Sequence, residues 1–254
     1  MLSLLVSLTL AQATLGGGIS DAERREVVAK ATPEELDKAM RETPVKELIE
    51  MGQRAVAALG TYSYRMHKQE RVKGEMHPVQ EILATVREVP FAARLEFIKG
   101  PGAGRRLLYN PAVRKDQFRV KEAGVLSILG GLWIDVDSSL ARKDSNHSVR
   151  EAGMGNLLAR FMRDYDRAAP LGGFAVKHEG WNDKGHYCSV WTSPNNGLGF
   201  DAAFSRICTD LKTGMPAKVE TFDPQHTPLE KYEFSEVKGL KVSEDFFKLE
   251  GAKL

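Results

Sequence analysis

The sequence predicts an α+β fold: a curved antiparallel sheet of about ten strands, forming an incomplete β-barrel, with helices over its concave face. Two observations support this. Short segments of alternating apolar and polar residues recur over 61–121 and 174–247, separated by Gly, Pro and Asn turns. Apolar stripes at helical spacing occur over 45–59 and 149–168. A helix with such a stripe must cover an apolar surface, and the oily face of a large sheet supplies one.

Residues 1–13 are expected to be a secretory signal peptide. An apolar run over 2–10 precedes Ala11-Gln12-Ala13, a small-x-small pattern, so the mature chain would begin at Thr14. No Lys or Arg precedes the run, and a buried strand or an uncleaved anchor are the alternatives. The run is too short to span a bilayer, which takes ~20 residues. We therefore expect secretion across the inner membrane, to the periplasm or the outside of the cell.

Helices are predicted between residues 20 and 60. Ser20 and Thr32 each begin a capping box, with a Glu three residues later, and the two short helices that follow make up an N-terminal segment over 14–43. A further helix begins at Thr43-Pro44 and ends at Gly60. Its apolar stripe consists of Val45, Leu48, Ile49, Ala55, Val56 and Leu59.

From Thr61 the apolar period changes to that of a strand. Tyr62, Tyr64 and Met66 alternate with polar residues, and similar alternation follows over 82–87, 91–97, 107–109 and 118–120. These segments predict antiparallel strands with one oily and one wet face.

A helical insert is expected over residues 124–170, within a single domain that spans 44–250. Ser148 and Glu151 form another capping box, which predicts a helix from Val149 to Ala168. Gly153 and Gly155 would weaken its first turn by roughly 1 kcal/mol each relative to Ala. We therefore expect a helix that starts loosely and can move. Its apolar stripe consists of Met154, Leu157, Leu158, Phe161, Met162 and Tyr165.

The two cysteines lie in residues 185–238, which are expected to form four consecutive strands. Cys188 and Cys208 are equally far from Leu198 in the turn region after Pro194, so a hairpin closed there sets them opposite each other. In an exported protein this arrangement predicts a disulfide bond. A bridge that closes a loop of about 20 residues would contribute ~3 kcal/mol.

Charge and motif spacing argue against several function classes. Lys and Arg number 36 and Asp and Glu 34, without a long basic run, so we expect no nucleic-acid partner. His178, Asp183 and His186 could meet in one turn, but their spacing fits no strong metal signature. We expect no metal and no cofactor.

Candidate catalytic groups are weak. Asp144, His147 and Ser148 are too close in sequence to form a triad, and no G-x-S-x-G elbow is present. Asp135 and Asp137 could act as a general acid and base, although their spacing favours the end of a strand. No catalytic residue is assigned.

Several short motifs accompany this order of elements. They are Tyr62-Ser63-Tyr64 with Lys68-Gln69-Glu70, Pro90-Phe91, residues 107–111, the insert from Asp135 to His147 with Gly153 and Leu157-Leu158, and residues 214–223, 229–239 and 244–246. Together, the motifs and the order of elements resemble the LolA/LolB-like periplasmic lipoprotein carriers and, within that fold, an uncharacterised bacterial family of secreted proteins.

The resemblance implies an incomplete barrel that holds acyl chains on its concave face beneath a helical lid. In such carriers an Arg on an early strand pins the lid. Arg65 and Arg87 are the nearest positions here, but the local sequence does not match and the role is not carried over.

We therefore expect an exported carrier that holds a lipid or a lipoprotein acyl chain between the sheet and the helical lid. We expect a monomer with transient contacts to membrane proteins. The expected pocket residues are Tyr62, Tyr64, Phe91, Leu95, Phe97, Phe118, Trp133, Leu158, Phe161, Met162 and Tyr165.

Two alternatives stay open. One is an exported hydrolase that uses Asp135, Asp137, His147 or the turn over 178–186. The other is an envelope module whose barrel is filled by its own side chains. We favour binding over catalysis, and a ligand-sized cavity would separate the carrier from the filled module.

Overall fold

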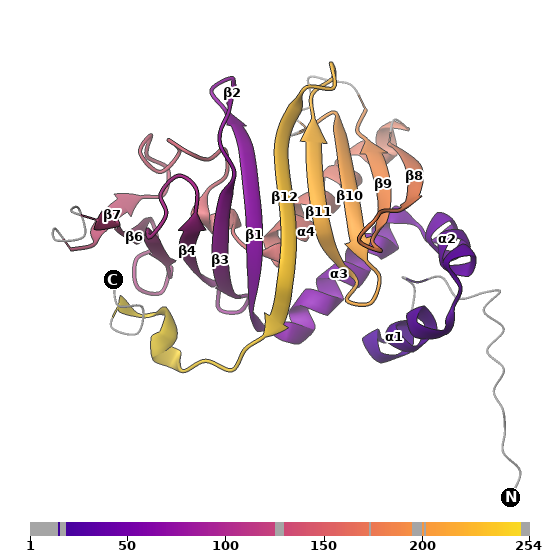
Figure 1. The fold of residues 1–254 in the computed structure, drawn as a ribbon, viewed down its shortest axis with the longest axis horizontal. Helices are drawn as coiled ribbons and strands as arrows, with labels where there is room; N and C mark the ends of the chain where they lie inside the picture. The colour runs from indigo at the N-terminus through magenta and orange to yellow at the C-terminus, as the bar shows by residue number, and fades with distance from the viewer. Residues whose placement is uncertain are drawn as a thin grey trace, which may run out of the picture.

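Twelve strands of the described chain form one antiparallel sheet that does not close (Figure 1). The structure, a computed structural model, describes residues 15, 19–124, 130–172, 174–194, 200 and 202–249. The expected signal peptide, residues 125–129 of the predicted insert and the turn around Leu198 lie outside these residues. The curved, open α+β fold predicted from the sequence is confirmed, with two more strands than the approximate number expected.

The sheet has two halves that meet at its centre. Its order is β7-β6-β5-β4-β3-β1-β12-β11-β10-β9-β8, with β2 paired to β1. The first half consists of β1 Thr61–Val72, β2 Glu75–Met76, β3 Gln80–Arg87, β4 Ala92–Lys99, β5 Arg106–Tyr109, β6 Gln117–Lys121 and β7 Leu132–Asp135. The second half consists of β8 Ala175–Trp181, β9 Tyr187–Thr192, β10 Phe204–Asp210, β11 Met215–Phe222 and β12 Pro228–Gly239.

The insert crosses the whole sheet, because β7 and β8 follow each other in sequence but form opposite edges. It carries the short 3-10 helices η3 Val149–Glu151 and η4 Ala169–Leu171 and, between them, α4 Met154–Ala168. Helix α3, Val45–Leu59, packs beside α4, and in Figure 1 both lie behind the sheet. The predicted helical cover is therefore built from α3 and the insert.

The N-terminal helices α1, Asp21–Lys30, and α2, Pro33–Glu42, begin at the predicted capping boxes. The Ser20 hydroxyl accepts a bond from the Glu23 N–H, and the Glu23 carboxylate accepts one from the Ser20 N–H. Thr32 and Glu35 repeat the arrangement. Apolar residues of α2 and α3 then pack against the second half of the sheet, in a cluster of Leu15, Leu36, Met40, Leu48, Met51, Tyr187 and Leu211.

The main core lies between the helices and the centre of the sheet. Phe161 of α4 packs edge-to-face on Trp191 of β9, with ring centroids 5.7 Å apart. Ile49 and Val56 of α3 join the same cluster. These side chains fill the space beneath the second half of the sheet.

A C-terminal 3-10 helix, η5 Glu244–Phe247, packs on the first half of the sheet. Phe247 is fully buried beside Ala92 and Leu108. Its carbonyl accepts a hydrogen bond from the side-chain amide of Asn110.

Helix α4 starts later than the predicted Val149, and its first residue contacts the sheet. The capping box of Ser148 caps only η3. Gly153, with φ +100°, then interrupts the helical conformation before Met154. The Met154 N–H donates to the hydroxyl of Tyr62 (2.8 Å), which donates to Glu88 (2.6 Å). One of the open N–H groups in the first turn of α4 is thus satisfied by a tyrosine of the sheet.

Gly153 and Gly155 allow this close approach. A Cβ on Gly153 would lie 3.1 Å from the Tyr62 hydroxyl, and one on Gly155 would lie 2.3 Å from a Glu88 oxygen. The two glycines that weaken an isolated helix are thus required by its contacts with the sheet.

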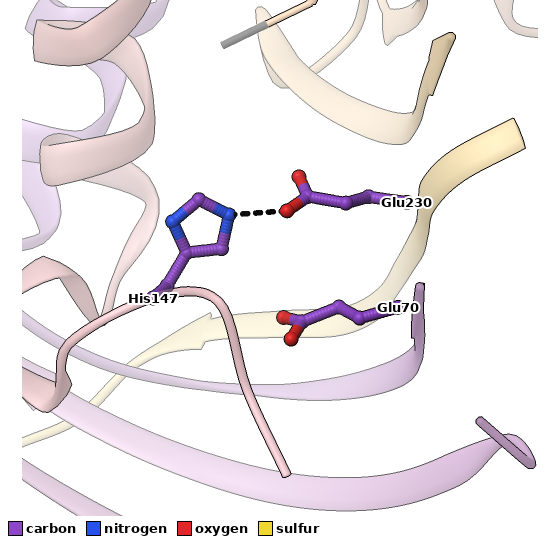
Figure 2. A group of neighbouring side chains, drawn as sticks. All are labelled: Glu70, His147 and Glu230. Atoms are coloured by element: carbon purple, nitrogen blue, oxygen red, sulfur yellow. Dashed lines mark hydrogen bonds and ion pairs between the residues drawn. The ribbon is translucent and has the colours of Figure 1, made fainter. Parts of the chain in front are cut away.

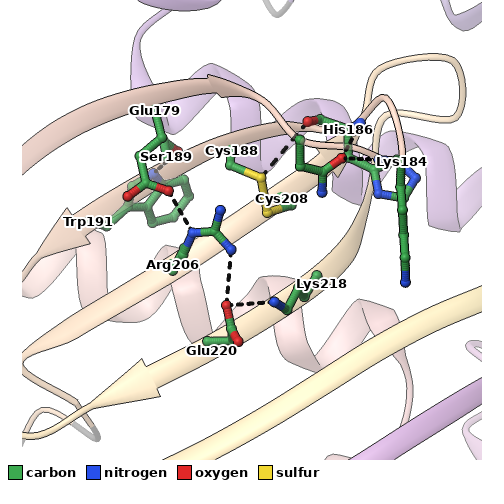
Figure 3. Close-up of a disulfide and its surroundings, with 11 residues drawn as sticks. Glu179, Lys184, His186, Cys188, Ser189, Trp191, Arg206, Cys208, Lys218 and Glu220 are labelled. Atoms are coloured by element: carbon green, nitrogen blue, oxygen red, sulfur yellow. Dashed lines mark hydrogen bonds and ion pairs between the residues drawn. A yellow bond between two sulfur atoms is a disulfide. The ribbon is translucent and has the colours of Figure 1, made fainter. Parts of the chain in front are cut away.

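The predicted disulfide joins Cys188 of β9 to Cys208 of β10, which face each other in the strand register (Figure 3). Their Cα atoms are 4.0 Å apart. Arg206, two residues from Cys208 and so on the same face of the strand, bonds Glu179 (2.6 Å) and Glu220 (3.1 Å). The bridge therefore fastens the second half of the sheet on the face away from the main core.

None of the helices in the described residues combines the length and the apolar character needed to cross a membrane.

Candidate ligand cavity

A cavity of about 550 Å³ lies between the first half of the sheet and the insert. Its sheet side is lined by alternating apolar residues of successive strands, which the register places on one face. These residues are Tyr64 and Met66 of β1, Ile82 of β3, Leu95 and Phe97 of β4, Leu107 of β5, Phe118 and Val120 of β6, Ile134 of β7 and Phe234 of β12.

The insert forms the opposite wall. Leu140, Ala141 and Val149 add apolar surface, and Leu157 does so from α4. Polar and charged groups are concentrated here and at the ends of the strands. The cavity thus has a largely apolar side on the sheet and a mixed side on the insert.

Four of the predicted pocket residues line this cavity: Tyr64, Leu95, Phe97 and Phe118. Among the described residues, the other seven lie elsewhere. Tyr62 caps α4, and Phe91 packs against Tyr109 with ring centroids 6.1 Å apart. Trp133 is half-buried beside the guanidinium groups of Arg114 and Arg119.

The four residues predicted on α4 belong to the main core. Leu158 and Phe161 are buried there, and Met162 and Tyr165 pack against them. Tyr165 meets Phe174 edge-to-face at 5.2 Å. They hold the helix in place and leave a different stripe of α4 to face the cavity.

At one end of the cavity two glutamates lie directly opposite each other on neighbouring strands. Glu70 of β1 pairs in register with Glu230 of β12, and their exposed fractions are only 2% and 9%. Facing carboxylates repel each other across a sheet, and burial strengthens the repulsion. Such a pair needs cationic partners.

His147 of the insert supplies one. Figure 2 shows Glu70 and Glu230 extending from neighbouring strands toward its ring. The His147 Nε2 lies 2.7 Å from a Glu230 oxygen, and its Nδ1 lies 3.0 Å from Glu151. The segment around His147 is thereby tied to the sheet.

Further groups complete a hub of charges, which we define as Lys68, Glu70, His147, Glu151, Arg160 and Glu230. The Lys68 ammonium lies 3.2 Å from Glu70, and Arg160 contacts the His147 ring. Glu70 also accepts bonds from the hydroxyl of Tyr232 and the N–H of Asn146. With His147 protonated, three cations balance three carboxylates.

The contacts fix the charge of His147. Burial acts to lower its pKa, but hydrogen bonds to Glu151 and Glu230 outweigh this and raise the pKa of His147 to about 9. The bond to His147 lowers the pKa of Glu151 to about 2. Burial opposes the ionised form of Glu230, yet its bond to His147 holds its pKa below the ordinary value. All three groups are therefore charged at neutral pH.

Glu70, His147 and Glu230 also offer three ligand atoms within 4.8 Å of one another, which is the donor set of a divalent metal. A metal would have to displace the His147 proton, which is held up to a pH of about 9. It would also lie beside the cations of Lys68 and Arg160. The residues therefore fit an ion-pair hub better than a metal centre.

The groups considered for a hydrolase have structural partners. Asp135 accepts a bond from the Asp137 N–H (2.8 Å), and Asp137 pairs with Arg150 (2.9 Å). In the described part of the chain, His178, Asp183 and His186 do not bring three ligand atoms within 4.8 Å. His147 lines the cavity, as do Asp144 and Ser148, the two neighbours considered with it for a triad.

The hub was not among the predicted site residues. Its signal was present, because Lys68 and Glu70 continue the core-facing phase of Tyr64 and Met66, and Glu230 has the phase of Tyr232. Charged residues in the apolar phase of a strand indicate a buried polar site.

Comparisons with known proteins find solved structures of similar fold at low sequence identity. Among curated proteins, none matches the chain. A solved LolA superfamily protein from Nitrosomonas europaea is 8% identical, with 80% of this chain and 96% of that chain covered and a TM-score of 0.37. Lipoprotein LppX from Mycobacterium tuberculosis is 14% identical, with 78% and 96% covered and a TM-score of 0.44.

A DUF1329 family protein from Desulfovibrio piger is 10% identical, with 82% of this chain and 99% of that chain covered and a TM-score of 0.41. The predicted resemblance to LolA-like proteins is thus confirmed, while scores below 0.5 transfer no ligand and no activity. The family model for a protein of unknown function, DUF1571, matches residues 59–247, from the end of α3 to η5. The chain therefore belongs to the DUF1571 family.

Proposed function

We propose that the protein binds a hydrophobic molecule of the size of one acyl chain in the cavity between the sheet and the insert. The cavity itself is the observation that supports this. At the ~30 Å³ that a water molecule takes in the liquid, it equals roughly 18 waters, and a methylene group is of similar size. The apolar sheet side would take up the hydrocarbon.

An exported location is part of the proposal. A buried disulfide is typical of proteins that fold in an oxidising compartment. The apolar N-terminal run followed by Ala11-Gln12-Ala13 is typical of a secretory signal. A carrier in that compartment would exchange its ligand with membranes or with membrane proteins through transient contacts, as a monomer.

The test is native mass spectrometry of the protein purified from cells, followed by lipid extraction and uptake of a fluorescent fatty acid. Ala159→Trp is the informative variant, because Ala159 is exposed on α4 and borders the cavity. A Trp there would occupy the mouth and abolish uptake. Ala58→Trp is the control, since Ala58 is an exposed helical alanine of α3 that does not border the cavity.

Uptake that is equal in both variants, or a parent protein that carries and takes up no lipid, would contradict the proposal. The second result would favour the envelope module. Turnover of esters that is lost on replacing His147 but kept in Ala159→Trp would instead favour the hydrolase.

A further inference from the structure

The wall that α4 presents to the cavity carries polar side chains beside Leu157 and Ala159, whereas the sheet opposite is largely apolar. Asn156, Arg160 and Arg163 all line the cavity and are spaced four and three residues apart, so they form one stripe of the helix. The apolar stripe with Leu158 and Phe161 packs in the main core. A ligand in the cavity therefore meets hydrocarbon on one side and polar groups on the other.

Each carboxylate that lines the cavity already has a cationic partner in the protein. The pairs, with their N–O distances, are Glu70 with Lys68 at 3.2 Å, Glu122 with Arg105 at 2.9 Å, Asp144 with Arg105 at 3.7 Å, and Glu151 with His147 at 3.0 Å. Among the described residues of the lining, every carboxylate is thus paired within the protein.

Two cations of the lining, unlike the others, have no partner within the described residues. Lys143 of the insert and Arg163 of α4 are both exposed at the edge of the cavity. Within the described residues, neither side chain takes part in a hydrogen bond or an ion pair. The rim of the cavity therefore carries an uncompensated positive charge.

We propose that the ligand is an anionic amphiphile, with its hydrocarbon against the sheet and its acidic headgroup against Lys143 and Arg163 at the rim. The headgroup is a carboxylate or a phosphate, both of which form strong charge-assisted bonds with Arg and Lys. This inference rests on the proposed function, because it requires a ligand in the cavity. The exposed rim also allows the headgroup to keep part of its hydration.

Calorimetric titration with three probes tests the headgroup. The probes are palmitate, 1-palmitoyl lysophosphatidylglycerol and the uncharged monopalmitoylglycerol, each below its micelle concentration. The variant reverses both charges, Lys143→Glu with Arg163→Glu. The control, Lys46→Glu with Lys212→Glu, makes the same change in net charge at exposed lysines away from the cavity.

The parent and the control pair should bind at least one anionic probe more tightly than monopalmitoylglycerol. The charge reversal should weaken that binding by about tenfold or more, because attraction becomes repulsion. Added salt should weaken it in the parent. A preference for palmitate or for the lysophospholipid then identifies the headgroup as a carboxylate or a phosphate. Circular dichroism checks that each variant is folded.

Failure of this inference and failure of the proposed function give different results. Monopalmitoylglycerol that binds as tightly as the anionic probes, or a charge reversal without effect, overturns the headgroup assignment and leaves hydrophobic binding intact. Absence of binding by all three probes overturns both.

Discussion

At the scale of single residues, the facing pair of Glu70 and Glu230 is the most demanding feature of the molecule. Two buried carboxylates in register would destabilise the centre of the sheet without cations. His147 bonds Glu230 directly and belongs to the insert, so it joins the wall of the cavity to the sheet. Replacing His147 should therefore lower the free energy of unfolding of the whole protein.

We therefore expect His147→Gln to lower the free energy of unfolding by about 3 kcal/mol, because it leaves Glu230 buried without its closest cation. His67→Gln is the control, as His67 is exposed on the other face of β1 and should change stability by less than about 0.5 kcal/mol. Urea unfolding measures both. A double variant, His147→Gln with Glu230→Gln, should recover part of the loss, and its failure to do so would argue against the direct pairing.

The pH dependence of stability follows from the same contacts. The pKa of His147 rises from 6.5 to about 9 on folding, so its contribution is complete below pH 6.5 and is lost as the pH rises through about 9. The pKa of Glu151 falls from 4.5 to about 2, so its contribution is present above pH 4.5 and is lost on acidification. The hub should therefore stabilise the folded protein most between pH 4.5 and pH 6.5, where both contributions are complete.

The groups that face His147 are Glu151 of η3, Glu230 and Tyr232 of β12, Arg160 of α4, and Glu70 of β1. Between pH 6 and pH 9.5, the free energy of unfolding of the parent should fall by about 3 kcal/mol more than that of His147→Gln. This follows from the rise of the His147 pKa to about 9, at ~1.36 kcal/mol per pKa unit. Urea unfolding of both proteins across this range measures the difference. Parallel curves would show that His147 has an ordinary pKa.

At the scale of elements, the start of α4 depends on a glycine that touches the sheet. Gly153→Ala should cost about 2–3 kcal/mol, because it adds a Cβ at positive φ against Tyr62 and Val86. Gly172→Ala should cost only about 1 kcal/mol, since Gly172 also has positive φ but faces open space. Thermal unfolding measures both losses. Gly153 also differs from Gly172 in ψ, 156° against 9°, and its conformation is nearly exclusive to glycine, so its loss combines backbone strain with the contact. Equal losses would mean that neither the contact nor this conformation adds to the cost.

The sequence predicted those elements whose signals are local. The capping boxes at Ser20 and Thr32 work within one helical turn, and the alternation of β1 needs only its own residues. The pairing of Cys188 and Cys208 was also predictable, because β9 and β10 are consecutive strands.

Features that depend on contacts between distant segments could not be predicted in this way. Glu70 and Glu230 meet only because the first and last long strands pair at the centre of the sheet. The late start of α4 depends on Tyr62 and Glu88, which belong to the sheet side of the molecule. Gly153 and Gly155 weaken an isolated helix, but in the fold they leave room for the side chains of Tyr62 and Glu88.

At the scale of the whole molecule, the two halves of the sheet are covered differently. Under the second half, α3 and the apolar stripe of α4 pack tightly around Trp191. Under the first half, the insert crosses as a loop and leaves the cavity. This division explains why the aromatic residues of α4 predicted for the pocket lie in the core, while those of β4 and β6 line the cavity.

The N-terminal helices should therefore affect stability without affecting the cavity. Leu36 of α2 is buried in the cluster with Leu48, Met51 and Tyr187, none of which lines the cavity. Leu36→Ala should lower the free energy of unfolding by about 2–4 kcal/mol. Its affinity for a bound acyl ligand should equal that of the parent, because the two regions share no residues.

Urea unfolding with and without palmitate measures both effects at once. A ligand that binds only the folded state adds about 2.7 kcal/mol at a concentration of 100 times its Kd, whatever the starting stability. The gap between the parent and Leu36→Ala should thus stay constant as palmitate is added. A gap that widens or closes would show that residues 14–43 are coupled to the cavity, and that the ligand-binding unit is larger than the domain predicted over residues 44–250.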